Sequence, residues 1–128
     1  MAQILLIDDN ELFRSIIKIM LESEKHHVGE ASNGEEGIDL FIAEEPTIII
    51  TDILMPTCDG LEFLQAISAI SHTVPVICMS GGISGDVSWI LPLTKTFGAM
   101  RFLRKPFGNA ELLAMVEGLF TQSAALAV

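Results

Sequence analysis

The sequence predicts an α/β protein with a doubly wound, five-stranded parallel sheet. Three observations point to this fold class. Short apolar runs alternate five times with segments whose apolar residues recur at helical spacing. The runs are apolar nearly throughout, as expected for parallel strands that are covered on both faces. Hydrophobic residues make up 50% of the 128 residues, which is sufficient for one dense core.

The first strand and helix are predicted from two adjacent patterns. Ile4–Ile7 is an apolar run that ends in two acids, which indicates a buried strand. Asn10 then offers an N-cap, because its side-chain oxygen can accept a hydrogen bond from a free helical N–H. The apolar residues at helical spacing after it are Leu12, Phe13, Ile16, Ile17 and Met20. His27–Ala31 is a weaker candidate for the second strand.

The second helix and third strand follow directly. Asn33 is predicted to cap the helix, and Pro46 lies beyond its end. The apolar residues of this helix are Ile38, Leu40, Phe41 and Ile42. Thr47–Ile50 is the clearest strand because every residue in it is β-branched, and it leads into Asp52. Proline and Asp-Gly signals predict a loop over residues 53–60.

The second half of the chain continues the alternation. A third helix is predicted from the spacing of Leu61, Phe63, Leu64 and Ile67. Val74–Met79 is the fourth strand, a glycine-containing loop covers residues 80–85, and a fourth helix should follow Asp86 and end before Gly98. Pro92 falls inside that helix and removes a helical hydrogen bond, so we expect the helix to be short, kinked or displaced.

The last strand and helix complete the pattern. Met100–Leu103 is predicted as the fifth strand, and Asn109 as the cap of the last helix. The apolar residues of that helix are Leu112, Leu113, Val116, Leu119 and Phe120. We expect residues 1–128 to form one domain, with a core over about 3–120 and a helical or frayed tail over 121–128.

Charge and composition exclude several functional classes. The formal net charge is −10, which disfavours direct nucleic-acid binding because phosphates need Lys and Arg. No apolar run reaches the ~20 residues of a membrane helix, and the N-terminal residues resemble no signal peptide, so we expect a cytoplasmic protein without membrane insertion. Cys58 and Cys78 are too few for a disulfide framework or a zinc site. His26, His27 and His72 lack metal-ligand spacing and are predicted to be surface residues.

Polar residues gather where the predicted strands end. Asp8 and Asp9 follow the first strand, Asp52 the third, Ser80 the fourth, and Lys105 lies near the end of the fifth. Ligands of open α/β sheets bind outside the carboxyl ends of the strands. If the first and third strands are neighbours, three carboxylates meet there and need a cation among them. Oxygen ligands of this kind suit Mg²⁺, with Mn²⁺ as an alternative.

The other two residues at this edge suit phosphoryl chemistry. Lys105 can neutralise a tetrahedral anion as a point charge. Ser80 supplies a hydroxyl donor. A cation site, a carboxylate nucleophile, a lysine and a hydroxyl together favour phosphoryl transfer onto an aspartate.

These residues identify a family resemblance that extends from about residue 4 to about residue 120. The sequence resembles the receiver domains of bacterial two-component response regulators, including stand-alone chemotaxis receivers. The matching residues are Asp8-Asp9, Asp52, Met55-Pro56, Asp59-Gly60, Ser80 and Lys105-Pro106-Phe107. The resemblance implies a flavodoxin-like receiver fold with strand order 2-1-3-4-5.

The resemblance also implies a role for each site residue. Asp52 would be the phosphoacceptor and a direct Mg²⁺ ligand, Asp9 the second direct ligand, and Asp8 a ligand through water. The backbone carbonyl of Leu54 would complete the protein ligands. The catalytic residues beside Asp52 would be Lys105, which pairs with the phosphoryl group, and Ser80, which donates a hydrogen bond to it. Ser80 and Phe102 would form the switch.

The implied partners are proteins. A sensor histidine kinase or a phosphotransfer protein would donate the phosphoryl group in a phosphorelay. A downstream protein would then recognise a changed face formed by the fourth helix, fifth strand and fifth helix. The domain would catalyse its own phosphorylation and slow dephosphorylation rather than a metabolic reaction.

Two departures from the family pattern affect these expectations. Leu54 stands two positions after the acceptor, and Gly82 two positions after Ser80. Neither side chain can orient an attacking water, so we expect slow loss of the phosphoryl group. Phe102 has no hydroxyl or ring nitrogen, so any switching there must act through packing.

Three alternative functions compete with this interpretation. A receiver-like interaction module that is not phosphorylated would not need the acid set, which here is complete. A hydrolase with an aspartyl nucleophile would need a cap or substrate pocket, for which the chain has no insertion. A flavin-binding flavodoxin relative would not place acids after the first strand, where they repel a phosphate.

Overall fold

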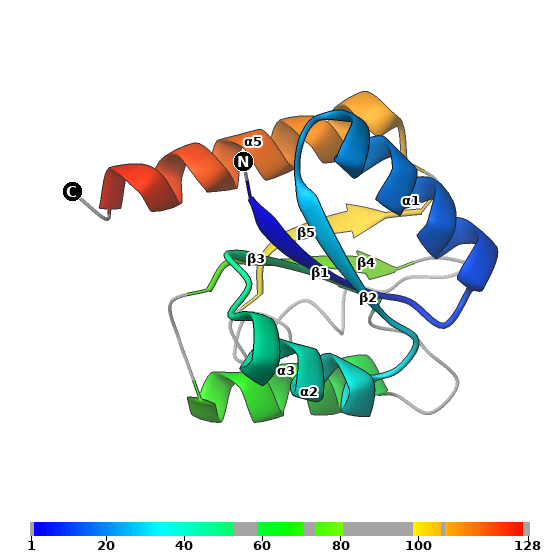
Figure 1. The fold of residues 1–128 in the computed structure, drawn as a ribbon, viewed down its shortest axis with the longest axis vertical. Helices are drawn as coiled ribbons and strands as arrows, with labels where there is room; N and C mark the ends of the chain where they lie inside the picture. The colour runs from blue at the N-terminus through cyan, green and yellow to red at the C-terminus, as the bar shows by residue number, and fades with distance from the viewer. Residues whose placement is uncertain (1, 53–58, 71–73, 81–98, 106, 127–128) are drawn as a thin grey trace.

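The chain forms one five-stranded parallel sheet in the order β2-β1-β3-β4-β5, as predicted. A computed structural model describes residues 2–52, 59–70, 74–80, 99–105 and 107–126. The strands are β1 (Gln3–Ile7), β2 (His27–Ala31), β3 (Ile48–Asp52), β4 (Val76–Ser80) and β5 (Ala99–Arg104). The helices within these residues are α1 (Glu11–Ser23), α2 (Gly34–Glu44), α3 (Asp59–Ile70) and α5 (Asn109–Leu126). Helices α1 and α5 cover one face of the sheet, and α2 and α3 cover the other (Figure 1).

The sheet divides the interior into two cores, because successive side chains of a strand point to opposite faces. In β1, Ile4 and Leu6 belong to the core that includes residues of α1 and α5. Leu5 and Ile7 belong to the core that includes residues of α2 and α3. All four side chains are at most 1% exposed. Burial on both faces is the physical reason for the uninterrupted apolar runs in the sequence.

Asparagine caps start the first two helices as predicted. The Asn10 side-chain oxygen accepts from the Phe13 amide at 3.0 Å. The Asn33 oxygen accepts from the Glu36 amide at 2.9 Å. The prediction for the last helix is wrong by one residue, because α5 already includes Asn109. There the carbonyl of Gly108 accepts the first helical hydrogen bond, from Leu112 at 3.2 Å.

Other boundaries also differ from the prediction. Strand β4 begins at Val76, because Pro75 has no N–H to give to the sheet, and it extends through Ser80. The predicted loop over residues 53–60 is wrong at its end, since α3 already begins at Asp59. The expected fourth helix and Pro92 lie outside the described residues, as do residues 53–58 and 81–85.

Several apolar helix residues face outward rather than into a core. Leu12, Ile16 and Ile19 are 73%, 52% and 68% exposed, and we call these three residues the outer face of α1. The helix packs on the sheet along one side only, where Ile17 and Leu21 are buried.

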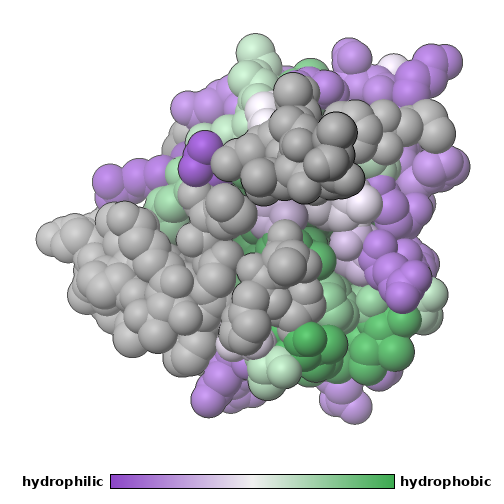
Figure 2. Space-filling view, turned by 90° about the vertical axis from the view of Figure 1, so that its left-hand side faces the viewer, coloured by the Kyte–Doolittle hydropathy of each residue, from purple (hydrophilic) through white to green (hydrophobic). Residues whose placement is uncertain are grey.

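The helices of the opposite layer also expose apolar residues. Ile42 of α2 and Ile70 of α3 are 64% and 55% exposed. Figure 2 shows an apolar area at its lower right, at the end of the molecule formed by this layer. None of the helices within the described ranges is long and apolar enough to cross a membrane.

His26 is buried, so its prediction as a surface residue is wrong. Its Nδ1 accepts from the Ala2 amide at 3.0 Å, and its Nε2 lies 2.9 Å from Oε1 of Glu117. Because Nδ1 accepts a hydrogen bond, the ring N–H is on Nε2, which donates a hydrogen bond to Oε1 of Glu117. The ring therefore joins the start of β1 to α5. His27 is exposed as predicted, and His72 lies outside the described residues.

The packing of α2 on β1 and α3 depends on Gly37. A Cβ at this position would lie 2.6 Å from Cδ1 of Ile7 and 2.9 Å from Cε1 of Phe63, and both neighbours are buried. We therefore expect Gly37→Ala to lower the free energy of unfolding by about 1–3 kcal/mol. Gly118→Ala in α5 is the matched control, because nothing lies within 4 Å of its Cβ. It should raise stability by up to ~1 kcal/mol through helix propensity. Urea unfolding measures both, and equal losses would contradict this interpretation.

Candidate functional site

Three carboxylates meet at the carboxyl edge of the sheet. Strands β1 and β3 are neighbours, with Ile7 opposite Thr51, so the residues that follow them lie side by side. Carboxylate oxygens of Asp8, Asp9 and Asp52 all lie within 4.8 Å of one another. Asp8 is fully buried and Asp52 is 6% exposed, whereas Asp9 is exposed. The site therefore concentrates negative charge at the end of two buried strands.

Lys105 bridges two of these carboxylates. Its Nζ lies 2.9 Å from Oδ2 of Asp8 and 3.2 Å from Oδ2 of Asp52. Burial lowers the pKa of Lys105, but the hydrogen bond to Asp8 and the charges of Asp52 and Asp8 outweigh burial, so the pKa is raised above 10.5. The ammonium group is therefore charged at neutral pH. It offsets part of the negative charge of the cluster.

The ligand atoms at this edge are of the type that a divalent cation prefers. The edge offers carboxylate oxygens from two buried residues and one exposed residue. Mg²⁺ prefers such oxygen ligands and typically keeps waters beside one or two carboxylates. The exposed Asp9 leaves one side of the cluster open to solvent.

Two aromatic rings lie behind the lysine. The Nζ of Lys105 lies 4.1 Å from the centre of the Phe13 ring, a distance suited to a cation–π interaction. Phe107 packs edge-on against Phe13, with 5.9 Å between ring centres. In the sequence, Phe13 belongs only to the apolar pattern of α1. No spacing rule connects it to a lysine 92 positions later.

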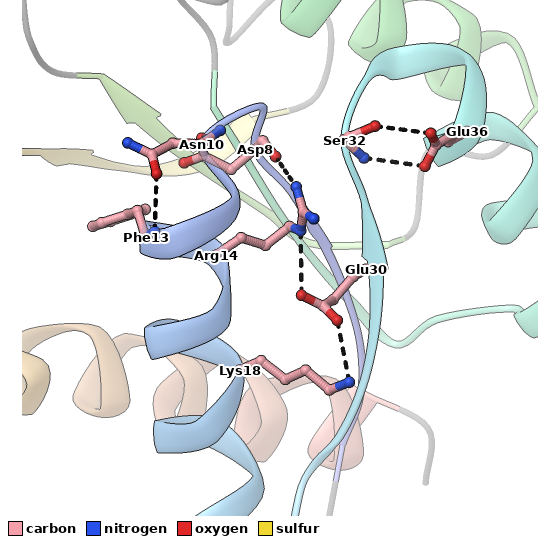
Figure 3. A network of polar contacts seen from close by, with 8 residues as sticks. All are labelled: Asp8, Asn10, Phe13, Arg14, Lys18, Glu30, Ser32 and Glu36. Carbon is pink, nitrogen blue, oxygen red and sulfur yellow. Dashed lines mark hydrogen bonds and ion pairs between the residues drawn. The ribbon is translucent and has the colours of Figure 1, made fainter.

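A second polar network holds the backbone beside the acids. Nη1 of Arg14 donates to the carbonyl oxygen of Asp8 at 2.6 Å, and Nε lies 3.2 Å from Oε1 of Glu30. Lys18 pairs with the other oxygen of Glu30 at 3.1 Å (Figure 3). The Asn10 amide donates to Oδ1 of Asp8 at 2.9 Å. No motif in the sequence points to Arg14 or Glu30; the only local signal is that Arg14 is one of just seven basic residues beside 17 acidic ones.

Of the other residues singled out in the sequence, the structure describes Ser80, Phe102 and Cys78. Ser80 is the last residue of β4, opposite Arg104 of β5, so it ends at the same sheet edge as Asp52. Phe102 is half-buried and packs against the core that includes α2 and α3. Leu54 and Cys58 lie outside the described residues. Burial raises the pKa of the Cys78 thiol to about 12, so this thiol is not a reactive group.

Glu30 makes the stability of this network sensitive to acid. Burial raises the pKa of Glu30, but hydrogen bonds from Lys18 and Arg14 and their charges lower it more, so the net pKa is below 4.5. A lowered carboxyl pKa stabilises the fold above the unfolded value, and this contribution is lost as the pH falls through the folded value. We expect wild type to lose more stability than Glu30→Gln between about pH 6 and about pH 3. Urea unfolding at the two pH values measures the difference, and parallel losses would contradict it.

Known proteins with similar sequences include two transcriptional or cell-cycle regulators. The chain is 30% identical over 125 residues to the uncharacterized transcriptional regulatory protein YesN of Bacillus subtilis, covering 95% of this chain and 33% of that protein. It is 32% identical over 123 residues to the cell cycle response regulator CtrA of Brucella ovis, covering 94% and 51%. The chain thus spans about a third to a half of the curated relatives it matches.

Solved structures with similar folds include two receivers. A response regulator receiver domain protein from Clostridium thermocellum is 30% identical with a TM-score of 0.87, covering 98% of this chain and 99% of that chain. The chemotaxis protein CheY4 of Vibrio cholerae is 26% identical with a TM-score of 0.84, covering 93% and 98%. The family model of the response regulator receiver domain matches residues 4–117. With its 2-1-3-4-5 sheet and the acids at its edge, the chain belongs to the response regulator receiver domain family.

Proposed function

We propose that this chain accepts a phosphoryl group on Asp52 from a histidine kinase or a histidine phosphotransfer protein in a Mg²⁺-dependent reaction. The observation that carries this proposal is the cluster of Asp8, Asp9 and Asp52 beside the ammonium group of Lys105. A carboxylate nucleophile beside a fixed cation is the arrangement that phosphoryl transfer requires.

The metal would be held by Asp52 and Asp9 directly and by Asp8 through water, with the backbone carbonyl of Leu54 as a further ligand. When bound, Mg²⁺ or Mn²⁺ would neutralise the negative charge of the acids and of the incoming phosphoryl oxygens. The support for this assignment is the set of three hard oxygen ligands that lie within 4.8 Å of one another.

In the reaction, a carboxylate oxygen of Asp52 attacks phosphorus. The bond between phosphorus and the donor's histidine nitrogen breaks, its electron pair stays on that nitrogen, and a phosphorus–oxygen bond to Asp52 forms. Lys105 would leave the carboxylates and pair with a phosphoryl oxygen, and Ser80 would donate its hydroxyl to another. Because the ammonium starts 3.2 Å from the Asp52 carboxylate, this change needs only a short movement.

The outer face of α1 supports a protein as the donor. Leu12 lies three positions after Asp9, so this apolar face begins beside the acidic edge. A donor histidine that reaches Asp52 must approach that same edge, and its own protein would then cover Leu12, Ile16 and Ile19. An apolar helical surface of the donor fits this arrangement.

Signalling would follow from the movement of Ser80 and a change in the packing of Phe102. Such a change would reach the surface formed by β5 and α5 and so alter the affinity for a downstream protein. Because Phe102 offers no polar ring atom, the change would act through packing alone.

The phosphoryl group should be lost slowly, since Leu54 offers only an apolar side chain and Gly82 has none, so neither can orient water. We expect Leu54→Asn to shorten the lifetime of the phosphorylated protein, because the new amide can hold an attacking water. Intact-mass spectrometry after removal of the donor measures the decay of both proteins. Rapid decay of wild type in the absence of a phosphatase would contradict this prediction.

The proposed function is tested with a small phosphodonor such as acetyl phosphate and the purified chain. We expect one phosphoryl group per chain with Mg²⁺ and none with EDTA, as measured by intact mass. Peptide mapping after trapping of the acyl phosphate should identify Asp52. A chain that takes up no phosphoryl group with Mg²⁺ would instead be an interaction module with a receiver fold.

A further inference from the structure

Arg14 connects three elements beside the acidic edge. It lies on α1, its Nη1 donates to the main-chain carbonyl that follows β1, and its Nε donates to Glu30 on β2. The Arg14 side chain is only 13% exposed. In Figure 3 the guanidinium group lies between Asp8 and Glu30 and faces both. Arg14 therefore contacts the backbone of the candidate metal site without contacting its carboxylates.

The carbonyl that Arg14 binds belongs to the peptide between Asp8 and Asp9. The orientation of this peptide sets the directions in which both carboxylates leave the backbone. The other groups of Asp8 are also occupied: its amide donates to Ala31 at 3.1 Å, and its side chain accepts from Asn10 and Lys105. Arg14 adds a hydrogen bond to the carbonyl oxygen of this peptide, at a short distance of 2.6 Å.

The geometry depends on a guanidinium group. Nε and Nη1 donate in two directions at the same time, to Glu30 and to Asp8. A lysine ammonium on a flexible chain does not reproduce this planar fork. Arg14 binds Oε1 of Glu30, whereas Lys18 binds the other oxygen, Oε2, at 3.1 Å, so the contact with Arg14 does not require Lys18.

We propose that Arg14, anchored by Glu30, is a positioning residue for the cation site. It holds the Asp8–Asp9 peptide so that both carboxylates are arranged before the cation binds. This inference rests on the proposed function, since it takes Mg²⁺ as the cation. Residues that orient metal ligands without touching the metal typically contribute 10–100-fold to affinity.

The test measures Mg²⁺ affinity by isothermal titration calorimetry on wild type and three variants. Arg14→Lys keeps the positive charge but loses the fork, and Glu30→Gln removes the anchor's charge. Lys18→Met is the matched control, because Lys18 contacts the same Glu30 but no atom of Asp8. We expect affinity to fall about tenfold for Arg14→Lys and less for Glu30→Gln, and to stay within about twofold for Lys18→Met.

Phosphorylation kinetics separate positioning from a general structural role. In Arg14→Lys the Mg²⁺ concentration for half-maximal rate should rise about tenfold, while the rate at saturating Mg²⁺ stays close to wild type. Circular dichroism establishes that each variant is folded at the assay temperature. If Arg14→Lys fails to fold, Glu30→Gln against Lys18→Met decides the question.

The possible outcomes distinguish this inference from the proposed function. If wild type does not bind Mg²⁺, the proposed function fails and the inference falls with it. If wild type binds Mg²⁺ and Arg14→Lys and Glu30→Gln bind equally well, only the inference is overturned, and Arg14 is an ordinary link between α1 and β2. An equal loss in Lys18→Met would also overturn it, because the effect would then come from the ion-pair network as a whole.

Discussion

Asp52→Asn is expected to reduce phosphoryl uptake from a small phosphodonor to the background of the assay. The substitution keeps the shape of the side chain but replaces a carboxylate oxygen nucleophile by a neutral amide. The amide also offers a poorer ligand to Mg²⁺ than a carboxylate does. Both effects act on the same step, so this variant should show the largest loss of function of any single change.

Asp9→Asn separates the two effects of the Asp52 substitution. It leaves the nucleophile intact and removes one carboxylate from the metal cluster, in which Asp9 is the exposed member. We expect slower uptake that recovers in part as the Mg²⁺ concentration is raised, whereas Asp52→Asn should not recover at any Mg²⁺ concentration. Intact-mass time courses compare the two variants. Equal labelling of Asp52→Asn and wild type would remove Asp52 as the acceptor.

Lys105→Met is expected to destabilise the metal-free protein by about 3 kcal/mol, because two buried carboxylates both lose the ion pair with its ammonium group. The Lys105 ammonium lies within 3.2 Å of both Asp8 and Asp52, and these two side chains have little contact with water. Mg²⁺ should restore much of the lost stability by supplying the missing positive charge, since a ligand that binds only the folded state stabilises it. Phosphoryl transfer should remain slow even with Mg²⁺, because the phosphoryl group then lacks its lysine.

Lys18→Met is the control for the loss of a lysine. Lys18 also pairs with a carboxylate, but its side chain is 35% exposed, so its loss should cost no more than about 1 kcal/mol. Urea unfolding with EDTA and with Mg²⁺ measures all three proteins. Equal losses of stability in the two variants, or no effect of Mg²⁺ on Lys105→Met, would contradict the role of Lys105 in neutralising Asp8 and Asp52.

Wild type and Lys105→Met should also differ in how their stability changes at high pH. The folded pKa of Lys105 is raised above 10.5, so its contribution to stability is complete below that value and is lost as the pH rises through the folded pKa. In wild type this loss adds to the general alkaline destabilisation. In Lys105→Met it should be absent.

Most of the fold and the composition of the acidic edge follow from local patterns in the sequence. The apolar runs of β1 and β3, the caps Asn10 and Asn33, and the acids after the strands are all local patterns. Each depends on the chemistry of a few consecutive residues, and parallel pairing then brings the strand ends to one edge. The convergence of Asp8 and Asp52 was predictable for this reason.

The contacts that support this edge join residues far apart in the sequence and are visible only in the folded protein. His26 was expected at the surface, yet it is buried against Glu117, 91 positions away. The contacts of Phe13 with Lys105 and of Arg14 with Glu30 likewise join elements that no sequence spacing connects. Such contacts depend on where each helix lies on the sheet and how it is rotated. The packing of two complete cores determines this, and a local pattern does not contain that information.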